Sequence, residues 1–405
     1  MAIFAIITLN LFLRFFRLNV PPFVYLDEKN FFVPAAKSLL TQSTEPPYTI
    51  ISFGKVLIAS GIRLFGDNPW GWRAPSALFG ILAAVIVYLF AKKLFESQTV
   101  GITAVILFTF ETAWFVNSRV AMVEVFFATF VILAFYLLWL FIKDRRNYFL
   151  ITSSVIFGLA LATKWSALFP ILAAIISISF VSKLDASKKI TAVLALLITC
   201  LTVYFIALLP FIWQSGIDQF ILKHKQIWHY QTLWLPQNFQ KAAPYIPKFE
   251  YVKDTLQNPL LWLVDKPGTY LEEAQNGQVR EILFIFNPVI FWPGLLLLLV
   301  SLVKGFKDSD LRLLLMPLVF ASSYLPWFFS PRFSIPYYLL FGITALIINL
   351  AFYINILREK IPLVSYFYLF LVILFFILYY PLISFIPVSK DYLSLLTKLW
   401  QFPVP

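Results

Sequence analysis

Residues 14–28 read RFFRLNVPPFVYLDE and lie where the first apolar segment of the chain ends. A Pro-Pro pair stops a helix here, because proline has no N–H to donate and restricts the residue before it. Asp27 and Glu28 follow, in a chain with only 20 acidic residues among 405. Ionisable groups at membrane depth cost about 2.5–3.5 kcal/mol each, so they tend to mark functional cavities. We therefore take this stretch as a candidate functional segment; the alternative is a capped helix end with solvated charges.

The composition is that of a membrane protein. Hydrophobic residues make up 60% of the chain and aromatic residues 19%, and the mean hydropathy is +0.83. Several apolar runs approach the roughly 20 residues that a membrane-spanning helix needs, and they lack the alternation of barrel strands. The expected fold class is an all-α polytopic membrane protein. The 32 Lys and Arg residues lie largely in short loops between these runs, which indicates membrane topology and not nucleic-acid binding.

Cysteine and histidine usage argues against a metal site. The single cysteine, Cys200, lies within an apolar run and cannot form an intrachain disulfide. His224 and His229 are not at the i, i+4 spacing of a helical zinc pair. No basic region or small-residue cleavage site precedes the first apolar run, so we expect an uncleaved anchor there.

About eleven membrane spans are predicted. They cover residues 3–18, 75–90, 100–116, 123–142, 148–163, a run ending at 182, 190–213, 283–303, 311–329, a run ending at 357, and 362–386. Basic clusters occupy alternate loops, at 92–93, 143–146, 183–189, 304–307 and 358–360. By the positive-inside rule this pattern places the N-terminus in the cytoplasm and the C-terminal tail outside. The first loop, Arg119, Lys164, the long polar loop and Arg332 then share the outer face.

We expect one membrane unit over residues 1–405, without a separate soluble domain. Its first outer loop covers about 20–75 and its long outer loop about 214–282. The long loop begins with apolar residues at helical spacing, from Ile217 to Trp228. This pattern predicts an amphipathic helix, either in the membrane interface or packed on the bundle.

The charged residues of the outer face suggest a chemistry. Adjacent carboxylates could hold a metal, relay protons or deprotonate a substrate, but a metal usually needs further oxygen or nitrogen ligands. Arg14, Arg73, Arg119 and Arg332 favour anion recognition, since guanidinium suits phosphate. A phosphate that enters a membrane cavity from the side belongs to a lipid. A carboxylate base with a cationic clamp therefore indicates group transfer from a polyprenyl phosphate.

Six short motifs then match one family in order. They are Arg14 with Asp27-Glu28 and Phe31; Gly54–Ala59; Gly71–Pro75 with Gly80; Ser118-Arg119 with Glu124; Ala162–Ser166; and Ser330–Arg332 with Tyr337-Tyr338. At these residues the chain resembles the protein O-mannosyltransferases, the dolichyl- or polyprenyl-phosphate-mannose–protein mannosyltransferases of glycosyltransferase family 39, which have the GT-C membrane fold. The likeness is to bacterial-type members, which lack the β-trefoil domain.

The chain departs from the family pattern at three places. Ile50-Ile51-Ser52 stand where His-Pro-Pro is usual, Asn30 replaces a histidine, and Glu124 replaces an aspartate. These departures bear on the acceptor and the sugar more than on the fold.

The resemblance implies an inverting transfer of a mannosyl (hexosyl) residue from a polyprenyl-phosphate lipid to Ser or Thr hydroxyls of secreted or membrane proteins. The reaction would take place on the extracytoplasmic face of the plasma membrane. No cofactor is implied beyond the lipid-phosphate sugar, which is a substrate, and stimulation by a divalent cation is left open. The alternatives are a related GT-C transferase with a lipid or glycan acceptor, such as the aminoarabinose type, and a transporter of lipid-linked sugars. A transporter is expected to show paired repeats with broken helices, which this sequence lacks.

Residue roles follow from the same resemblance. Asp27 would be the general base, and Glu28 would orient the acceptor or Asp27; its alternative is a salt bridge to Arg14 or Arg73. The remaining predicted site residues are the phosphate ligands Arg14, Arg73, Arg332 and Lys164, and the supporting residues Lys55, Arg119, Glu124 and Trp165. Arg119 and Glu124 could instead form only a buried ion pair, and Trp165 and Trp262 could line the cavity or anchor at the interface.

Overall fold

The computed structural model describes residues 2–41, 52–181, 184–232, 259–264, 268–275, 277–330 and 334–398. The α-helices are α1 (Ala2–Phe15), α2 (Val33–Thr41), α3 (Phe53–Phe65), α4 (Pro69–Leu94), α5 (Gln98–Thr109), α6 (Thr112–Asn117), α7 (Val123–Asp144), α8 (Asn147–Thr163), α9 (Leu168–Ile176), α10 (Ala186–Ala207), α11 (Leu209–Ser215), α12 (Ile217–Thr232), α15 (Pro259–Trp262), α16 (Pro288–Lys307), α17 (Leu311–Tyr324), α18 (Leu340–Lys360), α19 (Pro362–Ile383) and α20 (Lys390–Lys398). Shorter 3-10 or π turns are η1 (Glu28–Phe32), η2 (Trp165–Ala167), η3 (Ser177–Val181), η5 (Leu325–Phe328) and η6 (Pro336–Leu339). The strands are β1 (Gly268–Gln275), β2 (Gln278–Phe284) and β3 (Val388–Ser389).

The helices lie where the apolar runs of the sequence predict them. Among the described residues, seven are long and apolar enough to cross a membrane: α4, α7, α10, α16, α17 with η5, η6 with α18, and α19. Shorter apolar helices cover Ile3–Phe15, Gln98–Thr109, Asn147–Thr163 and Trp165–Phe180. Each predicted span overlaps one of these segments. The third, expected over 100–116, ends at Thr109, and the eighth, expected from 283, begins only at Pro288 because residues 283 and 284 belong to β2. How many of them cross the bilayer, and in which direction, stays a prediction.

The boundary of the second predicted span needs a correction. Helix α4 begins at Pro69, well before the expected residue 75. Asn68 caps it, because its side-chain oxygen accepts from the backbone N–H groups of Trp70 and Gly71, and Pro69 occupies the first turn, where its missing N–H costs nothing. Arg73 therefore lies inside this helix and not ahead of it.

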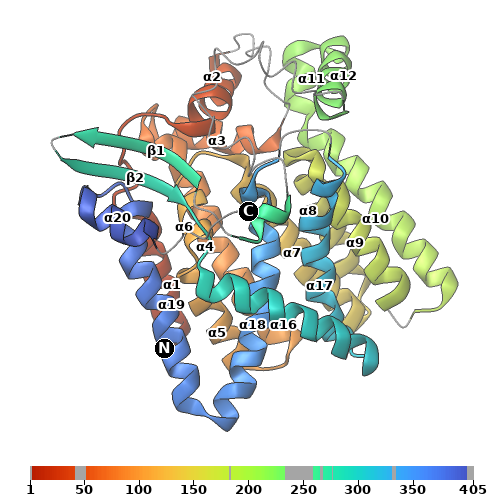
Figure 1. Cartoon of the computed structure of the whole chain (residues 1–405). Coiled ribbons are helices and arrows are strands. Elements are labelled where there is room, and N and C mark those ends of the chain that lie inside the picture. The colour runs from red at the N-terminus through yellow and green to blue at the C-terminus, as the bar shows by residue number, and fades with distance from the viewer. Residues whose placement is uncertain are drawn as a thin grey trace.

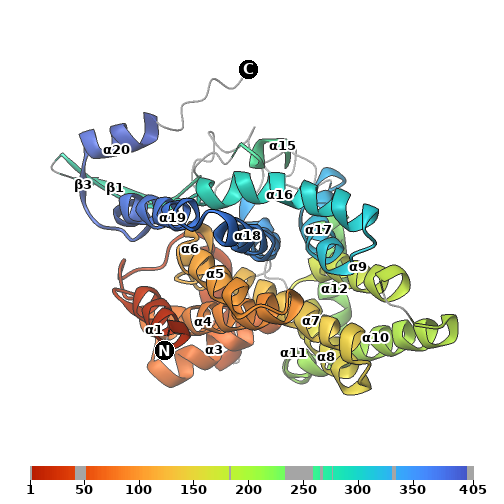
Figure 2. The same ribbon diagram turned by 90° about the horizontal axis from the view of Figure 1, so that it is seen from below.

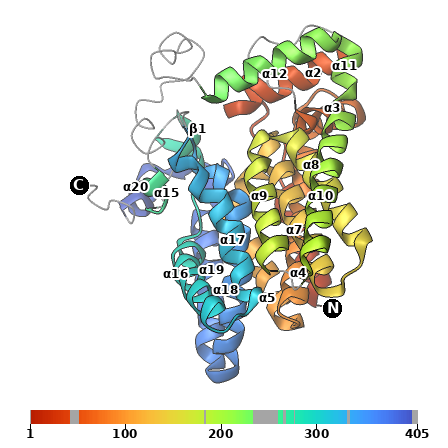
Figure 3. The same ribbon diagram turned by 90° about the vertical axis from the view of Figure 1, so that its right-hand side faces the viewer.

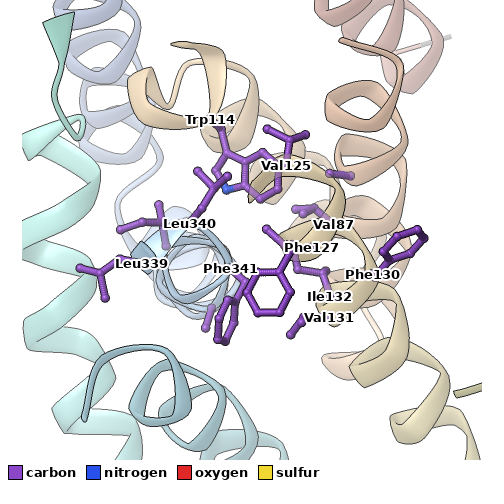
Figure 4. Close-up of a cluster of buried hydrophobic side chains, with 14 of the residues drawn as sticks. Val87, Trp114, Val125, Phe127, Phe130, Val131, Ile132, Leu339, Leu340 and Phe341 are labelled. Atoms are coloured by element: carbon purple, nitrogen blue, oxygen red, sulfur yellow. The ribbon is translucent and has the colours of Figure 1, made fainter. Parts of the chain in front are cut away.

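Helices α7 and α18 form the centre of the bundle. The most apolar stretch of each is 83% buried, against 22% for α10 and α19 at the periphery. Phe127 of α7 meets Phe341 of α18 edge to face, with ring centroids 5.6 Å apart (Figure 4). Viewed from below, α18 lies between two groups of helices, with α16 and α19 on one side and α5 and α7 on the other (Figure 2). Trp114 attaches α6 to the central helix α18, since its Nε1 donates to Thr344 Oγ1 at 3.1 Å.

The two predicted outer loops gather at one end of the bundle. Helix α2 of the first loop lies beside α11, at the junction of the seventh span and the long loop, where Gln214 Nε2 donates to the Ser38 carbonyl at 3.5 Å; α12 of the long loop continues at the same end (Figures 1 and 3). The helix predicted from residue 217 is present as α12. Its Phe220 and Ile227 are buried while Trp228 is exposed, so α12 packs on its neighbours by one edge and leaves apolar surface on the other.

The expectation of an all-α chain was wrong for the end of the long loop. Strands β1 and β2 form an antiparallel hairpin there, with Gln275 opposite Gln278 at the turn. Gly277 has φ +76, a left-handed conformation that glycine adopts without strain and that tight hairpin turns require. Strand β3 adds to the free side of β2, which gives the order β1-β2-β3 (Figure 1).

Candidate active site

Asp27 lies at the start of η1, immediately after the turn that follows α1. Its carboxylate is half-buried, and Oδ2 accepts a hydrogen bond from the hydroxyl of Tyr337 at 3.0 Å. Tyr337 belongs to η6, which leads into the central helix α18. The predicted base is therefore attached to the core of the bundle by a residue 310 positions away in the chain.

A narrow pocket lies next to this contact. Tyr337 lines it together with Lys164, Glu124, Tyr338 and Ser166. The Lys164 ammonium is 3.2 Å from Glu124 Oε1 and 3.6 Å from the centre of the Tyr338 ring. A carboxylate and the negative face of an aromatic ring both stabilise the charged ammonium in this setting. The pocket thus contains one fixed cation and is lined by the tyrosine that binds Asp27.

Glu28 turns away from Asp27 and into the protein. It is fully buried and forms a two-pronged salt bridge with Arg73, with both N···O distances 2.9 Å. Glu28 also accepts from the backbone N–H of Ala121 at 2.7 Å. The alternative interpretation of Glu28, a salt bridge to Arg73, is the one that the geometry shows.

Arg73 uses all its N–H groups inside the protein. Besides Glu28, it donates to the carbonyl oxygens of Leu18, Pro21 and Phe23 at 2.7–3.2 Å. A guanidinium has five N–H donors, and these contacts engage each of them. Arg73 therefore fixes the first outer loop to α4 and has no N–H left for the phosphate that the sequence assigned to it.

Arg119 caps the end of α1 and does not pair with Glu124. Its Nη1 donates to the carbonyls of Leu13, Arg14 and Phe16, and its Nη2 to that of Arg17, at 2.7–3.0 Å. The last carbonyls of a helix have no partner within the helix, and a cation there also interacts favourably with the negative end of the helix dipole. The buried ion pair between Arg119 and Glu124 is not formed, because Glu124 binds Lys164 instead.

Arg14 is enclosed by α1, α4 and α5. It is fully buried, its Nη1 donates to Asn10, and its guanidinium carbon lies 5.4 Å from the centre of the Phe108 ring. Gly80 makes room for it, since a Cβ there would be 2.7 Å from Arg14 Nε. This position is inside the helix bundle, so the structure does not bring Arg14 to the pocket beside Asp27.

Ser52 connects the start of α3 to the residue before Lys164, and Lys55 lies in the same first turn. Lys55 is buried in the first turn of α3, and Ser52 caps that helix by accepting from the N–H of Gly54. The Ser52 hydroxyl also donates to the carbonyl of Thr163 at 2.7 Å, next to Lys164. Ser52 thus has a structural task at the place where the family pattern differs. The neighbouring Ile50 and Ile51 lie outside the described residues, as does the predicted phosphate ligand Arg332.

The two tryptophans proposed as cavity residues are not among the residues that line the described pocket. Trp165 donates from Nε1 to the hydroxyl of Tyr204 at 3.0 Å, and Tyr204 in turn binds His224 of α12. Trp262 is buried, with its ring 6.3 Å from that of Trp327, which does line the pocket. Within the part of the chain that the structure describes, no group of three or more His, Cys, Asp or Glu side chains could hold a metal ion.

Tyr337 and Tyr270 are site residues that the sequence did not identify. Tyr337 belongs to a motif noted above, but nothing in the sequence pairs it with Asp27. Tyr270 of β1 lies beside it, with ring centroids 6.3 Å apart, and donates to Asn117 Oδ1 at 3.3 Å. Burial, followed by the charges of Glu124 and Asp27, raises the pKa of the Tyr270 hydroxyl well above its usual range. Tyr270 therefore stays neutral and keeps its proton for hydrogen bonding.

The fold and part of the sequence are similar to known proteins. Residues 53–213 match the family model described as dolichyl-phosphate-mannose-protein mannosyltransferase. The polyprenol-phosphate-mannose–protein mannosyltransferase of Mycolicibacterium smegmatis is 30% identical over 174 residues, which cover 36% of this chain and 34% of that protein. The chain thus matches about a third of the length of this curated relative. The resemblance inferred from the sequence motifs is confirmed over this segment.

Solved structures confirm the GT-C fold over nearly the whole chain. A chain of the Saccharomyces cerevisiae Pmt1-Pmt2 complex bound to the sugar donor superposes with a TM-score of 0.78 at 12% identity, covering 99% of this chain and 92% of that one. ArnT from Cupriavidus metallidurans gives a TM-score of 0.57 at 13% identity, covering 87% of this chain and 59% of that one. At these identities the likeness concerns the fold alone.

Proposed function

We propose that this chain is a membrane glycosyltransferase that moves a mannosyl (hexosyl) residue from a polyprenyl-phosphate lipid to Ser or Thr hydroxyls of proteins. The similarity of residues 53–213 to protein mannosyltransferases supports the reaction class. The observation that carries the proposal is the contact between Asp27 and Tyr337, beside a pocket that contains Lys164. It provides a carboxylate base and a fixed cation at one site.

In this reaction Asp27 takes the proton of the acceptor hydroxyl. The acceptor oxygen attacks the anomeric carbon from the face opposite the phosphate, so the configuration inverts. The bond between that carbon and the phosphate oxygen breaks, and its electron pair leaves with the polyprenyl phosphate. Lys164 meets the charge that grows on the leaving group, because a pre-positioned cation stabilises developing charge without reorganisation. The predicted phosphate contact of Arg332 would act in the same way.

Glu28 and Arg73 serve this reaction indirectly. They hold the first outer loop against α4, and Asp27 is the residue directly before Glu28. A general base contributes only if it is kept within hydrogen-bond reach of the proton that it removes. We therefore assign positioning of Asp27 to the Glu28–Arg73 pair and not a contact with the donor.

The proposed location is the plasma membrane, with the site on the extracytoplasmic face. The apolar helices support a multi-pass membrane protein. The basic clusters in alternate loops support this orientation by the positive-inside rule.

Transfer by the purified protein in liposomes tests the proposal. The donor is polyprenyl-phosphate-[¹⁴C]mannose, the acceptor is a Ser/Thr-rich peptide, and the lipid fraction is counted separately. Label on the peptide supports the proposal. Label on a lipid or glycan instead would identify a related transferase, which the fold shared with ArnT makes the main competitor. Movement of intact donor across the bilayer without transfer would identify a transporter.

A further inference from the structure

Among the described residues, strand β1 leaves one edge of the small sheet open. In that part of the chain the strand order is β1-β2-β3, so β2 is paired on both sides and β1 on one. Figure 1 shows β1 on the side of the hairpin away from α20. Within the described residues, no backbone hydrogen bond reaches the outer edge of β1. Proteins usually protect such edges, because unpaired N–H and C=O groups are a template for another strand.

The open edge begins at the candidate active site. Tyr270, near the start of β1, lies beside Tyr337, and Tyr337 binds Asp27. The other end of the strand, from Glu272 to Gln275, is exposed. A chain paired along this edge would therefore run from solvent towards the predicted base.

The register shows which backbone groups face outwards. The two residues that flank a two-residue turn bind each other through their backbone N–H and C=O groups. Along the strand, the backbone groups of successive residues then point alternately towards the partner strand and towards the other edge. Gln275 and Gln278 flank the turn, so Leu271 and Glu273 face β2 in the same way. Glu272 and Ala274 then direct their N–H and C=O groups to the open edge.

We propose that the outer edge of β1 binds the acceptor polypeptide as an added strand and delivers its hydroxyl side chain to Asp27. This proposal rests on the proposed function and names how that site holds its protein substrate. Backbone pairing supplies affinity without demanding one acceptor sequence. Glu272 and Glu273 are exposed and acidic on this strand, so the acceptor segment that fits best carries basic residues beside the modified Ser or Thr.

Substitution of Ala274 tests the pairing. Ala274→Pro removes an outward N–H, whereas the control Ala274→Val keeps it and suits a strand. Ala274 is four residues from Tyr270, or about 13 Å of extended chain, so a tripeptide acceptor at the site would not reach it. We expect Ala274→Pro to raise the KM for a 15-residue acceptor peptide at least about tenfold, with the tripeptide and the Ala274→Val protein unaffected.

A second measurement uses the peptide itself. N-methylation of single backbone nitrogens on one side of the Ser or Thr should weaken transfer at every second position, which is the period of a strand. Glu272→Lys should reduce the preference for basic peptides, while Glu272→Gln reduces it less. Equal KM values for Ala274→Pro and Ala274→Val, or no alternation in the N-methyl series, would overturn the added-strand proposal. Absence of peptide labelling by the unmodified protein would instead contradict the proposed function.

Discussion

At the scale of single residues, Glu28 and Arg73 are a buried ion pair whose polar atoms are satisfied by the protein. The two side chains are fully buried, and between them they bind three carbonyls and the N–H of Ala121. A buried pair of this kind contributes little net stability, but removing one partner leaves an uncompensated charge that costs about 3–5 kcal/mol. Its effect is to specify where the first outer loop sits.

We expect Arg73→Lys to lower the thermal stability of the protein in detergent and to leave the KM for the donor unchanged. Lysine keeps the charge but cannot make the two-pronged contact or reach all three carbonyls. The Tm should fall, and kcat should fall with it as the loop that carries Asp27 loosens. Arg63→Lys is a suitable control, since Arg63 lies on the exposed side of α3. An unchanged Tm with a raised KM for the donor would show instead that Arg73 binds phosphate.

In the proposed reaction, Tyr337 acts through its hydrogen bond to Asp27. Tyr337→Phe removes the hydroxyl that donates to Asp27 Oδ2 and keeps the aromatic ring. A hydrogen bond to the ionised carboxylate favours that form, so its loss should move the acidic limb of the kcat/KM profile to higher pH. We expect kcat to fall about tenfold with little change in the KM for the donor.

Tyr338→Phe is the matched control for this experiment. Tyr338 holds Lys164 through its ring face, which phenylalanine retains. A pH profile that does not move in Tyr337→Phe, or that moves equally in both variants, would contradict a specific role of the Tyr337 hydroxyl.

At the scale of elements, the β1–β2 hairpin contains an unfavourable carboxylate. Glu281 of β2 is 5% exposed and lies opposite Glu272 of β1. Burial, and then the charge of Glu272, raises the pKa of Glu281 to about 7 from the ordinary value of 4.5. The folded hairpin therefore binds a proton between these two pH values that the unfolded chain releases, so its stability falls as pH rises from 4.5 through 7.

Glu281→Gln should relieve this loss. At pH 8 we expect the hairpin of the variant to be more stable than that of the unmodified protein by up to about 3 kcal/mol, with little difference near pH 4.5. Hydrogen exchange of the hairpin amides across this range measures the difference. Glu273→Gln is the control, because Glu273 is exposed and lies opposite Arg280. A constant difference between Glu281→Gln and the unmodified protein at all pH values would be inconsistent with the raised pKa.

The helices were predictable from sequence, and the hairpin was not. Long apolar runs leave the backbone only helical hydrogen bonding in a membrane, so composition alone places them. The hairpin is a short pair of strands within a polar loop, and its strand β1 carries Glu, Gln and Tyr in place of a clear alternation. The Asn276-Gly277 pair was the available signal, since this dipeptide favours tight hairpin turns.

At the scale of the whole molecule, this chain and the yeast structure share a fold although few of their residues are identical. The superposition on the yeast structure covers 99% of the chain at 12% identity. Apolar cores tolerate substitution when volume and pattern are preserved, which explains how so few identical residues keep the same bundle. Most of the described motif residues lie in or next to η1 and η6, near the ends of α1, α6 and α8, and in the first halves of α3, α4 and α7.

The identity of the site residues was partly predictable, but their partners were not. Motif spacing identified Asp27, Lys164 and Glu124. The contacts that define the site join residues far apart in the sequence. Glu28 and Arg73 are 45 positions apart, and Asp27 and Tyr337 are 310 positions apart. No local periodicity encodes such pairs. For this reason Arg73 was predicted to bind the donor phosphate, and Arg119 to support the site or pair with Glu124, although the fold uses both to hold backbone carbonyls.

The most direct test of the central claim is the liposome transfer assay with Asp27→Asn beside Asp185→Asn. Asp185 is an exposed carboxylate, 78% accessible, whose only ion pair among the described residues is with Lys188. If Asp27 is the base, Asp27→Asn should lower mannosyl transfer to the peptide about 10²–10⁴-fold while Asp185→Asn transfers at the unmodified rate. Peptide labelling by Asp27→Asn at the unmodified rate would contradict the claim.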